Sequence, residues 1–142
     1  MIAENASWPT LPYYKVEYSN CPPLLKGYNH RQLNAEEITE SCELLLATAK
    51  LHACPYWLLD GRSHQQPQPQ SLHDWMQEEY FPRVKRELGQ PLRIAFLVPE
   101  VVWASLPDRG YDYPSDWPLH VARMGWFVEE APALDWLARQ RT

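Results

Sequence analysis

The first patterned segment of the chain is apolar at Tyr14, Val16 and Tyr18 and polar at the positions between them. This period of two predicts a β-strand with one buried face. Asn20 and the two prolines that follow indicate a turn, and a second strand is expected over residues 24–31. The two segments together predict an antiparallel hairpin.

A helical period follows the hairpin. Asn34 followed by Glu37 has the spacing of a capping box, in which each residue satisfies a free amide of the other's backbone. Apolar residues then recur three and four positions apart, which predicts one buried stripe. The stripe consists of Ile38, Cys42, Leu45, Leu46, Ala49 and Ala53. After Pro55, the apolar run YWLL closed by Asp60 predicts a strand buried on both faces.

A second helix is expected to begin at Ser71, which serves as the N-cap, with Asp74 three residues later. The predicted buried face contains Leu72, Trp75, Met76, Tyr80, Val84 and Leu88. Pro82 lies within this pattern. Because proline has no amide proton to donate, a kink is expected near Phe81.

The strongest strand pattern is the apolar run LRIAFLV over residues 92–98, which ends at Pro99. Pro99 is expected to open a short helix through residues 102–106. The segment 107–118, which is rich in Asp, Tyr and Pro, is expected to be an exposed loop.

The last part of the chain is expected to add a helical turn over residues 119–124 and a short strand over 126–128. Glu129, Glu130 and Pro132 favour the start of a final helix, because acids and proline are stabilising in a first turn. Leu134, Leu137 and Ala138 are predicted to face inward in this helix.

The predicted element order is therefore β-β-α-β-α-β-α-β-α. This order predicts the α/β class, with one mixed, mostly parallel sheet that begins with an antiparallel hairpin and continues through right-handed crossovers. The chain has 142 residues, which suits one domain. Residues 1–11 are interpreted as a loose leader and residues 12–142 as the single domain.

Composition narrows the functional classes. The chain is 45% hydrophobic and 22% charged, which is ordinary for a globular protein. A formal net charge of −5 disfavours nucleic acid as a partner. Three cysteines without a C-x-x-C spacing suit neither a disulfide framework nor a zinc site, and no targeting or membrane-spanning segment is recognised. A cytoplasmic location is expected.

Four strings carry a family resemblance: WLLDGR, EEYFPR, LRIAFLVP and GWFVEEAPALDWL. In this order, over residues 13–139, the chain resembles the SpoIIAA-like branch of the bacterial STAS domains, which are anti-sigma-factor antagonists. The resemblance implies a small STAS-like α/β fold and a regulatory binding module. Such modules are switched by phosphorylation of a Ser or Thr at the start of the helix after a strand that ends in Asp.

On this resemblance, Asp60 matches the acid at the strand end. Ser71 is then the candidate phosphoacceptor by position, and Ser63 is the second candidate. The Asp-Ser-Ser-Gly type of string is absent, and a Gln- and Pro-rich stretch over residues 62–70 stands in its place. A comparison of this branch with lipid-binding folds implies an apolar ligand as a further alternative.

Crevices at the carboxyl ends of parallel strands are where open α/β sheets bind ligands. Asp60, Arg62, Ser63 and Ser71 are therefore candidate residues for binding a ligand or a partner. The alternative is an ordinary strand-end turn, in which Asp60 accepts backbone amides and Arg62 is solvated.

The sequence supports a catalytic function less well than a binding function. A serine hydrolase would use Ser63 or Ser71 with His64 or His73, but adjacency in sequence does not bring a triad together. No catalytic residue is assigned. The histidines show no metal-ligand spacing, so no metal and no cofactor are expected.

Four aromatic residues lie between the last two predicted strands: Trp103, Tyr111, Tyr113 and Trp117. They suit a binding patch or a self-association surface if exposed, or a lid on the core if they fold back.

The leading hypothesis is a non-enzymatic regulatory or protein-binding module of the STAS-like class. Its partner is then an unidentified protein or a second copy in a homodimer. The alternative is a carrier of a small apolar or amphipathic ligand, bound beneath the aromatic residues.

Overall fold

The computed structural model describes residues 11–66 and 68–141. The predicted leader, apart from its last residue, lies outside the described residues. The strands are β1 (Tyr14–Asn20), β2 (Pro23–Asn29), β3 (Tyr56–Asp60), β4 (Leu92–Leu97), β5 (Trp117–Pro118) and β6 (Ala122–Phe127). The helical elements are α2 (Ala35–His52), α3 (Gln70–Trp75), the π-helical turn η1 (Met76–Tyr80), α4 (Phe81–Leu88), α5 (Glu100–Ser105), the 3-10 turn η2 (Pro107–Arg109) and α6 (Glu130–Gln140).

Within the described residues, the strands form one sheet with the order β1-β2-β3-β4-β6-β5. The pairs β1–β2 and β6–β5 are antiparallel, and the pairs between β2, β3, β4 and β6 are parallel. The predicted mixed α/β sheet with an N-terminal hairpin is thus confirmed. The runs YWLL and LRIAFLV contain the adjacent central strands β3 and β4, as their continuous apolar character predicted.

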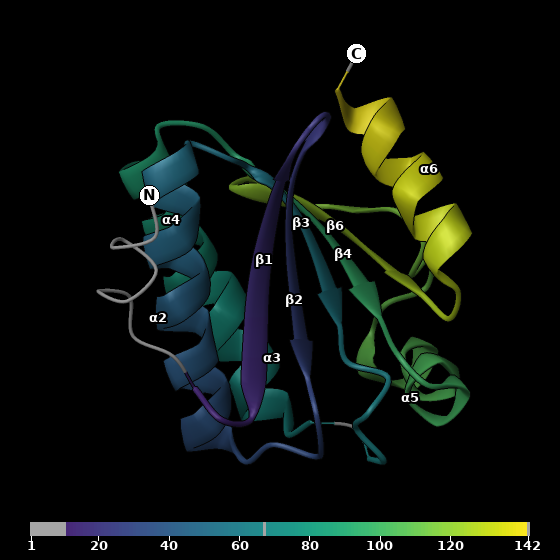
Figure 1. Cartoon of the computed structure of the whole chain (residues 1–142). Coiled ribbons are helices and arrows are strands. Elements are labelled where there is room, and N and C mark those ends of the chain that lie inside the picture. The colour runs from purple at the N-terminus through teal and green to yellow at the C-terminus, as the bar shows by residue number, and fades with distance from the viewer. Residues whose placement is uncertain (1–10, 67, 142) are drawn as a thin grey trace.

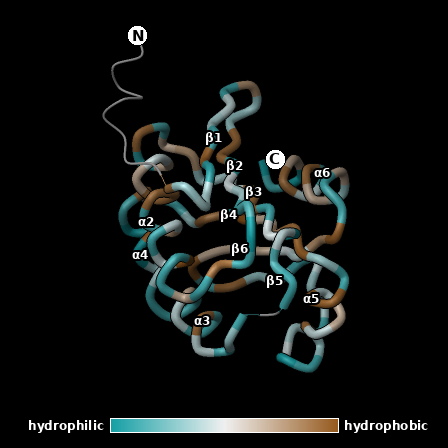
Figure 2. Tube along the Cα trace, turned by 60° about the horizontal axis from the view of Figure 1, so that its bottom comes forward, coloured by the Kyte–Doolittle hydropathy of each residue, from teal (hydrophilic) through white to brown (hydrophobic). Residues whose placement is uncertain are grey.

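Helices cover both faces of the sheet. Figure 1 shows α2, α3 and α4 on one face and α6 on the other, and the turned view in Figure 2 shows the same division. The larger core lies under α2, α3 and α4, and includes Leu45, Trp57 and Ile94. A smaller core lies under α6, and Leu97 of β4 and Trp136 of α6 both belong to it. The two cores follow from strands that are apolar on both faces.

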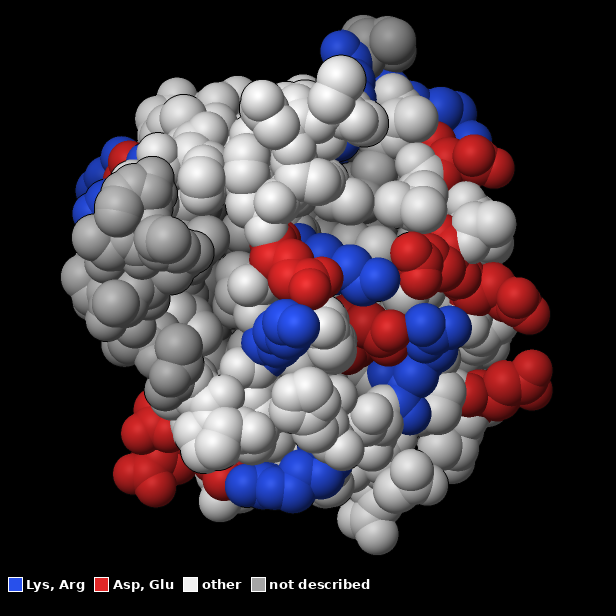
Figure 3. Space-filling model, viewed as in Figure 1, with Lys and Arg blue, Asp and Glu red and all other residues white. Residues whose placement is uncertain are grey.

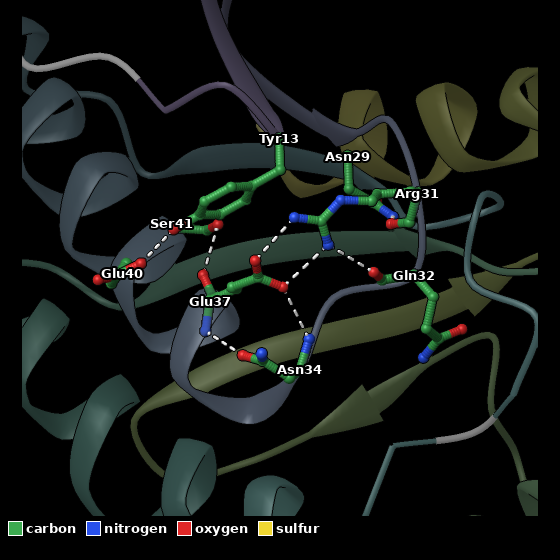
Figure 4. A network of polar contacts seen from close by, with 8 residues as sticks. All are labelled: Tyr13, Asn29, Arg31, Gln32, Asn34, Glu37, Glu40 and Ser41. Atoms are coloured by element: carbon green, nitrogen blue, oxygen red, sulfur yellow. Dashed lines mark hydrogen bonds and ion pairs between the residues drawn. The ribbon is translucent and has the colours of Figure 1, made fainter.

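A network of polar contacts fixes the start of α2 against the end of β2 (Figure 4). The side chain of Asn34 accepts from the amide of Glu37 at 2.8 Å, and the Glu37 carboxylate accepts from the amide of Asn34 at 3.1 Å. The predicted capping box is therefore confirmed. Arg31 also donates to both oxygens of Glu37, and these bonds lower the pKa of Glu37 to about 2.

The predicted apolar stripe of α2 is correct except at its ends. Cys42, Leu45, Leu46 and Ala49 are buried and Ile38 is half-buried. Ala53 is exposed, because it is the C-cap of the helix and adopts a left-handed conformation with φ of 51°. A residue at this position leaves the helical path, so its side chain leaves the stripe.

The second helical stretch begins one residue earlier than predicted. Pro69 occupies the N-cap position and the helix starts at Gln70, so the prediction of Ser71 as the N-cap is wrong. Ser71 lies in the first turn with an exposed side chain. The irregularity expected near Phe81 takes the form of η1, in which the amide of Phe81 donates to the carbonyl of Met76, five residues back. Pro82 follows directly and has no amide to continue a regular ladder.

Three predictions for the last third of the chain are wrong at least in part. Residues 119–124 form no helical turn, because β6 begins at Ala122 and pairs in parallel with β4. The expected loop over residues 107–118 contains η2 and the short strand β5. In α6, Ala133, Trp136 and Leu137 are buried, whereas Leu134 and Ala138 are exposed, so only Leu137 of the predicted inward residues is correct.

Gly125 allows the segment before β5 to approach β6 closely. A Cβ atom at this position would lie 2.7 Å from the carbonyl oxygen of Ser115 and 2.9 Å from the ring of Phe127. We expect Gly125→Ala to lower the free energy of unfolding by about 2 kcal/mol, because a backbone segment has to move. Gly61→Ala is the control, since its nearest atoms lie at 3.3 and 3.4 Å. Equal midpoints of urea unfolding for the two variants would contradict this account.

Candidate functional site

A cavity of about 160 Å³ lies between the sheet and the helices α2 and α3. It is found at the carboxyl ends of β3 and β4, which is where open α/β sheets bind ligands. Carbon atoms of α2, η1, α4, β4 and β6 form most of its wall. The main apolar side chains are Leu45, Leu72, Met76, Phe81, Phe96, Met124 and Trp126.

Polar side chains gather in the part of the wall that is formed by residues 60–77. They are Asp60, His64, Gln66, Gln68, His73 and Gln77. Gln66 is exposed and also lines the cavity, so the cavity reaches solvent in this region. The site therefore combines an apolar interior with a polar rim, which is typical of pockets for small molecules.

His64 is held in one neutral form by its neighbour. Its Nδ1 atom lies 3.0 Å from the side-chain nitrogen of Gln68. An amide nitrogen can only donate, so Nδ1 accepts, and the ring proton is on Nε2. Burial lowers the pKa of His64, which favours this neutral form.

His73 is held by a chain of two hydrogen bonds. The side-chain nitrogen of Gln77 donates to the hydroxyl oxygen of Tyr111 at 2.6 Å, and that hydroxyl is hydrogen-bonded to Nδ1 of His73 over a longer 3.4 Å. Burial, followed by the nearby charge of Arg109, lowers the pKa of His73 to about 4, although Asp74 acts in the opposite direction. His73 is therefore a neutral polar group of the cavity wall at neutral pH.

Asp60 forms a closed ion pair at the rim. Its two carboxylate oxygens accept from Nε and Nη2 of Arg62 at 3.0 and 2.7 Å, and the amide of Arg62 also donates to it at 3.1 Å. Burial acts to raise the pKa of Asp60, but the bonds from Arg62 outweigh this effect and the pKa is lowered. The structure thus contains the strand-end turn, with Asp60 accepting a backbone amide, but Arg62 is ion-paired to Asp60 and not simply solvated as this alternative expected.

Two further ionisable groups line the cavity from the side of α2 and β1. The thiol of Cys42 is fully buried, which raises its pKa to about 12, and burial also raises the pKa of Tyr14. Both groups are therefore neutral. Ser41 lies next to Cys42 in the wall, and its hydroxyl donates to the carbonyl of Glu37 at 2.9 Å.

The predicted site residues do not converge. Asp60 lines the cavity, but Arg62, Ser63 and Ser71 do not. Ser63 is half-buried and Ser71 is exposed, and neither histidine ring in this region bonds to a serine within the described residues. The serine–histidine pairs of the hydrolase hypothesis are thus not assembled in the described part of the chain.

The four aromatic residues of the predicted patch lie in different environments. Tyr111 is buried and its ring lies 4.5 Å from that of Trp126, so it folds back onto the core at the edge of the cavity. Trp103 and Trp117 are half-buried, and Tyr113 is 78% exposed. None of the four lines the cavity directly. Tyr111 thus follows the alternative in which the aromatic residues fold back on the core, exposed Tyr113 does not, and Trp117 belongs to strand β5.

Sequence reasoning missed most of the wall. Phe96, Met124 and Trp126 alternate with residues of the opposite sheet face, and their convergence depends on the pairing of β4 with β6. One local signal was present: His73 and Gln77 are four residues apart, next to Leu72 and Met76, which are also four apart. Two polar residues beside the apolar stripe of one helix indicate a partly polar environment on its inner side.

No group of three or more metal-ligating residues occurs in residues 11–66 and 68–141, and no helix there is long and apolar enough to cross a membrane. Comparison with protein-family models gave no match, and neither curated proteins nor solved structures gave one. The resemblance to STAS domains therefore stays a prediction based on the element order and the four strings.

Proposed function

We propose that this protein binds a small apolar or amphipathic molecule in the cavity between α2, α3 and the sheet. The observation that carries the proposal is the apolar wall of a cavity of about 160 Å³ with a polar rim. A dry apolar cavity of about 150 Å³ accepts a molecule of the size of benzene. The apolar part of the ligand is therefore about one ring or a short alkyl chain.

The rim sets the polar part of the ligand. His64 and His73 are neutral and Asp60 is neutralised by Arg62. A neutral hydrogen-bonding group on the ligand would meet these side chains without leaving an unpaired charge in the wall. An alcohol or a carbonyl compound of small size fits these conditions better than an ion.

The binding experiment compares toluene with 1-hexanol, each titrated into the isotope-labelled protein and followed by NMR. We expect saturable shifts at amides near Phe96, Met76 and His73 for both compounds. Shifts that rise linearly, or that spread over the surface away from the cavity, would contradict the proposal.

Ser41→Leu tests the position of the ligand. Ser41 is buried in the cavity wall, so a leucine at this position fills part of the space that the ligand needs. We expect the affinity for 1-hexanol to fall about tenfold or more, a loss of about 1.4 kcal/mol. Stability is expected to rise, because the cavity shrinks and a polar group leaves the core.

Thr48→Leu is the matched control for Ser41→Leu. Thr48 lies on the same helix and donates its hydroxyl to the carbonyl of Leu44 at 2.8 Å, as Ser41 does to Glu37. It does not line the cavity. Equal affinity of the two variants for 1-hexanol would place the ligand elsewhere.

The regulatory role implied by the STAS resemblance stays compatible with ligand binding. The exposed hydroxyl of Ser71 in the first turn of α3 favours it as the acceptor over half-buried Ser63. A phosphate at this position would lie near the positive end of a helix dipole. Failure of Ser71→Ala to change the phosphorylation of the protein in its host would remove this support.

A further inference from the structure

A second hollow lies on the other face of the sheet, next to the last turn of α6. It is lined by three arginines, Arg93, Arg123 and Arg139, together with Asp116, Ser115, Phe127, Trp136 and Gln140. We call this hollow the arginine groove. It is unrelated to the cavity, which lies beneath α2 and α3.

Strand register brings two of the arginines together. Arg93 on β4 and Arg123 on β6 are paired neighbours in the parallel ladder. Ala95 and Leu97 of β4 pack in the core under α6, and Arg93 shares their side of the strand because side chains alternate. Two like charges on neighbouring strands repel each other, so this placement is unfavourable unless negative charge lies close by.

The groove is lined by one carboxylate, that of Asp116, which is already hydrogen-bonded to groups of the protein. Asp116 accepts from Nε and Nη2 of Arg123 at 2.8 and 2.7 Å, and also from the indole nitrogen of Trp136 at 3.3 Å. The guanidinium of Arg93 donates to the carbonyl of Pro91 at 3.0 Å and forms no ion pair within the described residues. Arg93 therefore brings to the groove a positive charge without an ion pair in the described residues, although the whole chain has a formal net charge of −5.

Helix electrostatics accounts for only one of these cations. Arg139 lies in the last turn of α6, where a cation is stabilised by the helix dipole. Arg93 and Arg123 are on strands, so no helix dipole stabilises their charges. On the face of β1 and β2, by comparison, Figure 3 shows cations and acids side by side, and Lys26 there lies 3.6 Å from Glu130.

We propose that the arginine groove binds a phosphate-type oxyanion through the guanidinium groups of Arg93 and Arg123. A guanidinium presents a planar fork of donors that matches the oxygens of phosphate in pairs. The wall is mainly polar, and Phe127 and Trp136 are buried beneath it, so the groove suits the anionic group itself and no large apolar body. Inorganic phosphate and the phosphoryl group of an ester share this chemistry.

The test measures binding of inorganic phosphate and of glycerol 3-phosphate by calorimetry, with chloride at equal ionic strength as the reference. We expect saturable binding of at least one phosphate compound. Preference for the ester identifies an organic phosphate as the source of the group, and preference for inorganic phosphate identifies the free ion. Heats that do not exceed the chloride reference for either compound overturn the proposal.

Arg93→Gln assigns the binding to the groove. We expect this variant to bind phosphate about tenfold more weakly, because a hydrogen-bonded charge pair is lost. Arg93→Lys keeps the positive charge but loses the planar set of guanidinium donors. Its affinity for phosphate is expected to lie between those of the wild type and Arg93→Gln. Arg86→Gln is the matched control, since Arg86 is an exposed arginine on α4 outside the groove.

The unfolding curve of Arg93→Gln without phosphate checks that the variant is folded. Stability equal to or above that of the wild type is expected, because one of two repelling charges is gone. If Arg93→Gln, Arg93→Lys and Arg86→Gln all bind phosphate as the wild type does, the anion does not bind in the groove and the proposal fails.

Discussion

Replacement of Trp57 by alanine is expected to lower the free energy of unfolding by about 4 kcal/mol. Trp57 is fully buried in the central strand β3, between Leu25 of β2 and Ile94 of β4. Removal of such a side chain costs its transfer free energy and leaves a cavity, which together amount to about 3–5 kcal/mol for large aromatic residues. A domain of this size has about 5–15 kcal/mol in total, so the loss is a large part of its stability.

Trp57→Phe separates packing from hydrogen bonding. The indole nitrogen of Trp57 donates to the carbonyl of Cys54 at 2.9 Å, and phenylalanine cannot replace this bond. We expect a loss of about 1–2 kcal/mol for Trp57→Phe, since most of the buried area stays. Urea unfolding followed by far-UV circular dichroism measures both variants. If Trp57→Ala unfolds within about 1 kcal/mol of the wild type, Trp57 is not in the core.

The central strands could be predicted because their own residues determine their burial. YWLL and LRIAFLV are apolar on both faces, and only a strand between two helical layers satisfies both. The capping box at Asn34 was equally local, since both of its partners lie within one turn. Such features are readable because the interacting groups are close in sequence.

The edge of the sheet could not be predicted in the same way. β6 contains the charged Arg123 and the glycine Gly125, which lower the strand signal, and its pairing with β4 supplies what the local pattern lacks. β5 has two residues and depends on β6 for its hydrogen bonds. Strand propensity is set largely by neighbours of this kind, so the local pattern predicts a loop over residues 107–118 and a helical turn over 119–124 instead of these strands.

The candidate sites, too, could be predicted only where they depend on residues close together in the sequence. Asp60 was placed at a strand end, and that placement is correct because the acid ends an apolar run. A cavity, by contrast, is the space left between side chains from several elements, and no segment encodes it alone. The arginine groove likewise depends on register, because residues 93 and 123 become neighbours only when β4 pairs with β6.

The pH dependence of stability provides a further test of the cavity. The pKa of His73 is about 4 in the folded protein, whereas its ordinary value is 6.5. Between these values the unfolded chain binds a proton that the folded chain does not, so stability falls as the pH decreases from 6.5 towards 4. The full shift corresponds to about 3 kcal/mol at most, and the partial exposure of the ring lowers this figure.

His73→Gln is expected to lose this part of the pH dependence, because glutamine does not titrate and its amide can still donate to or accept from the hydroxyl of Tyr111. Arg109, Asp74 and Tyr111 are the charged or titratable groups that act on His73, and they stay in the variant. The measurement is urea unfolding of both proteins between about pH 4 and pH 7, with His120→Gln, an exposed histidine, as the control. At neutral pH we expect the wild type to have the higher free energy of unfolding. Its advantage over His73→Gln should shrink as the pH falls, and the variant should become the more stable protein at the lowest pH. A constant difference would mean that the ring is solvated, and the polar rim would then lie outside the cavity wall.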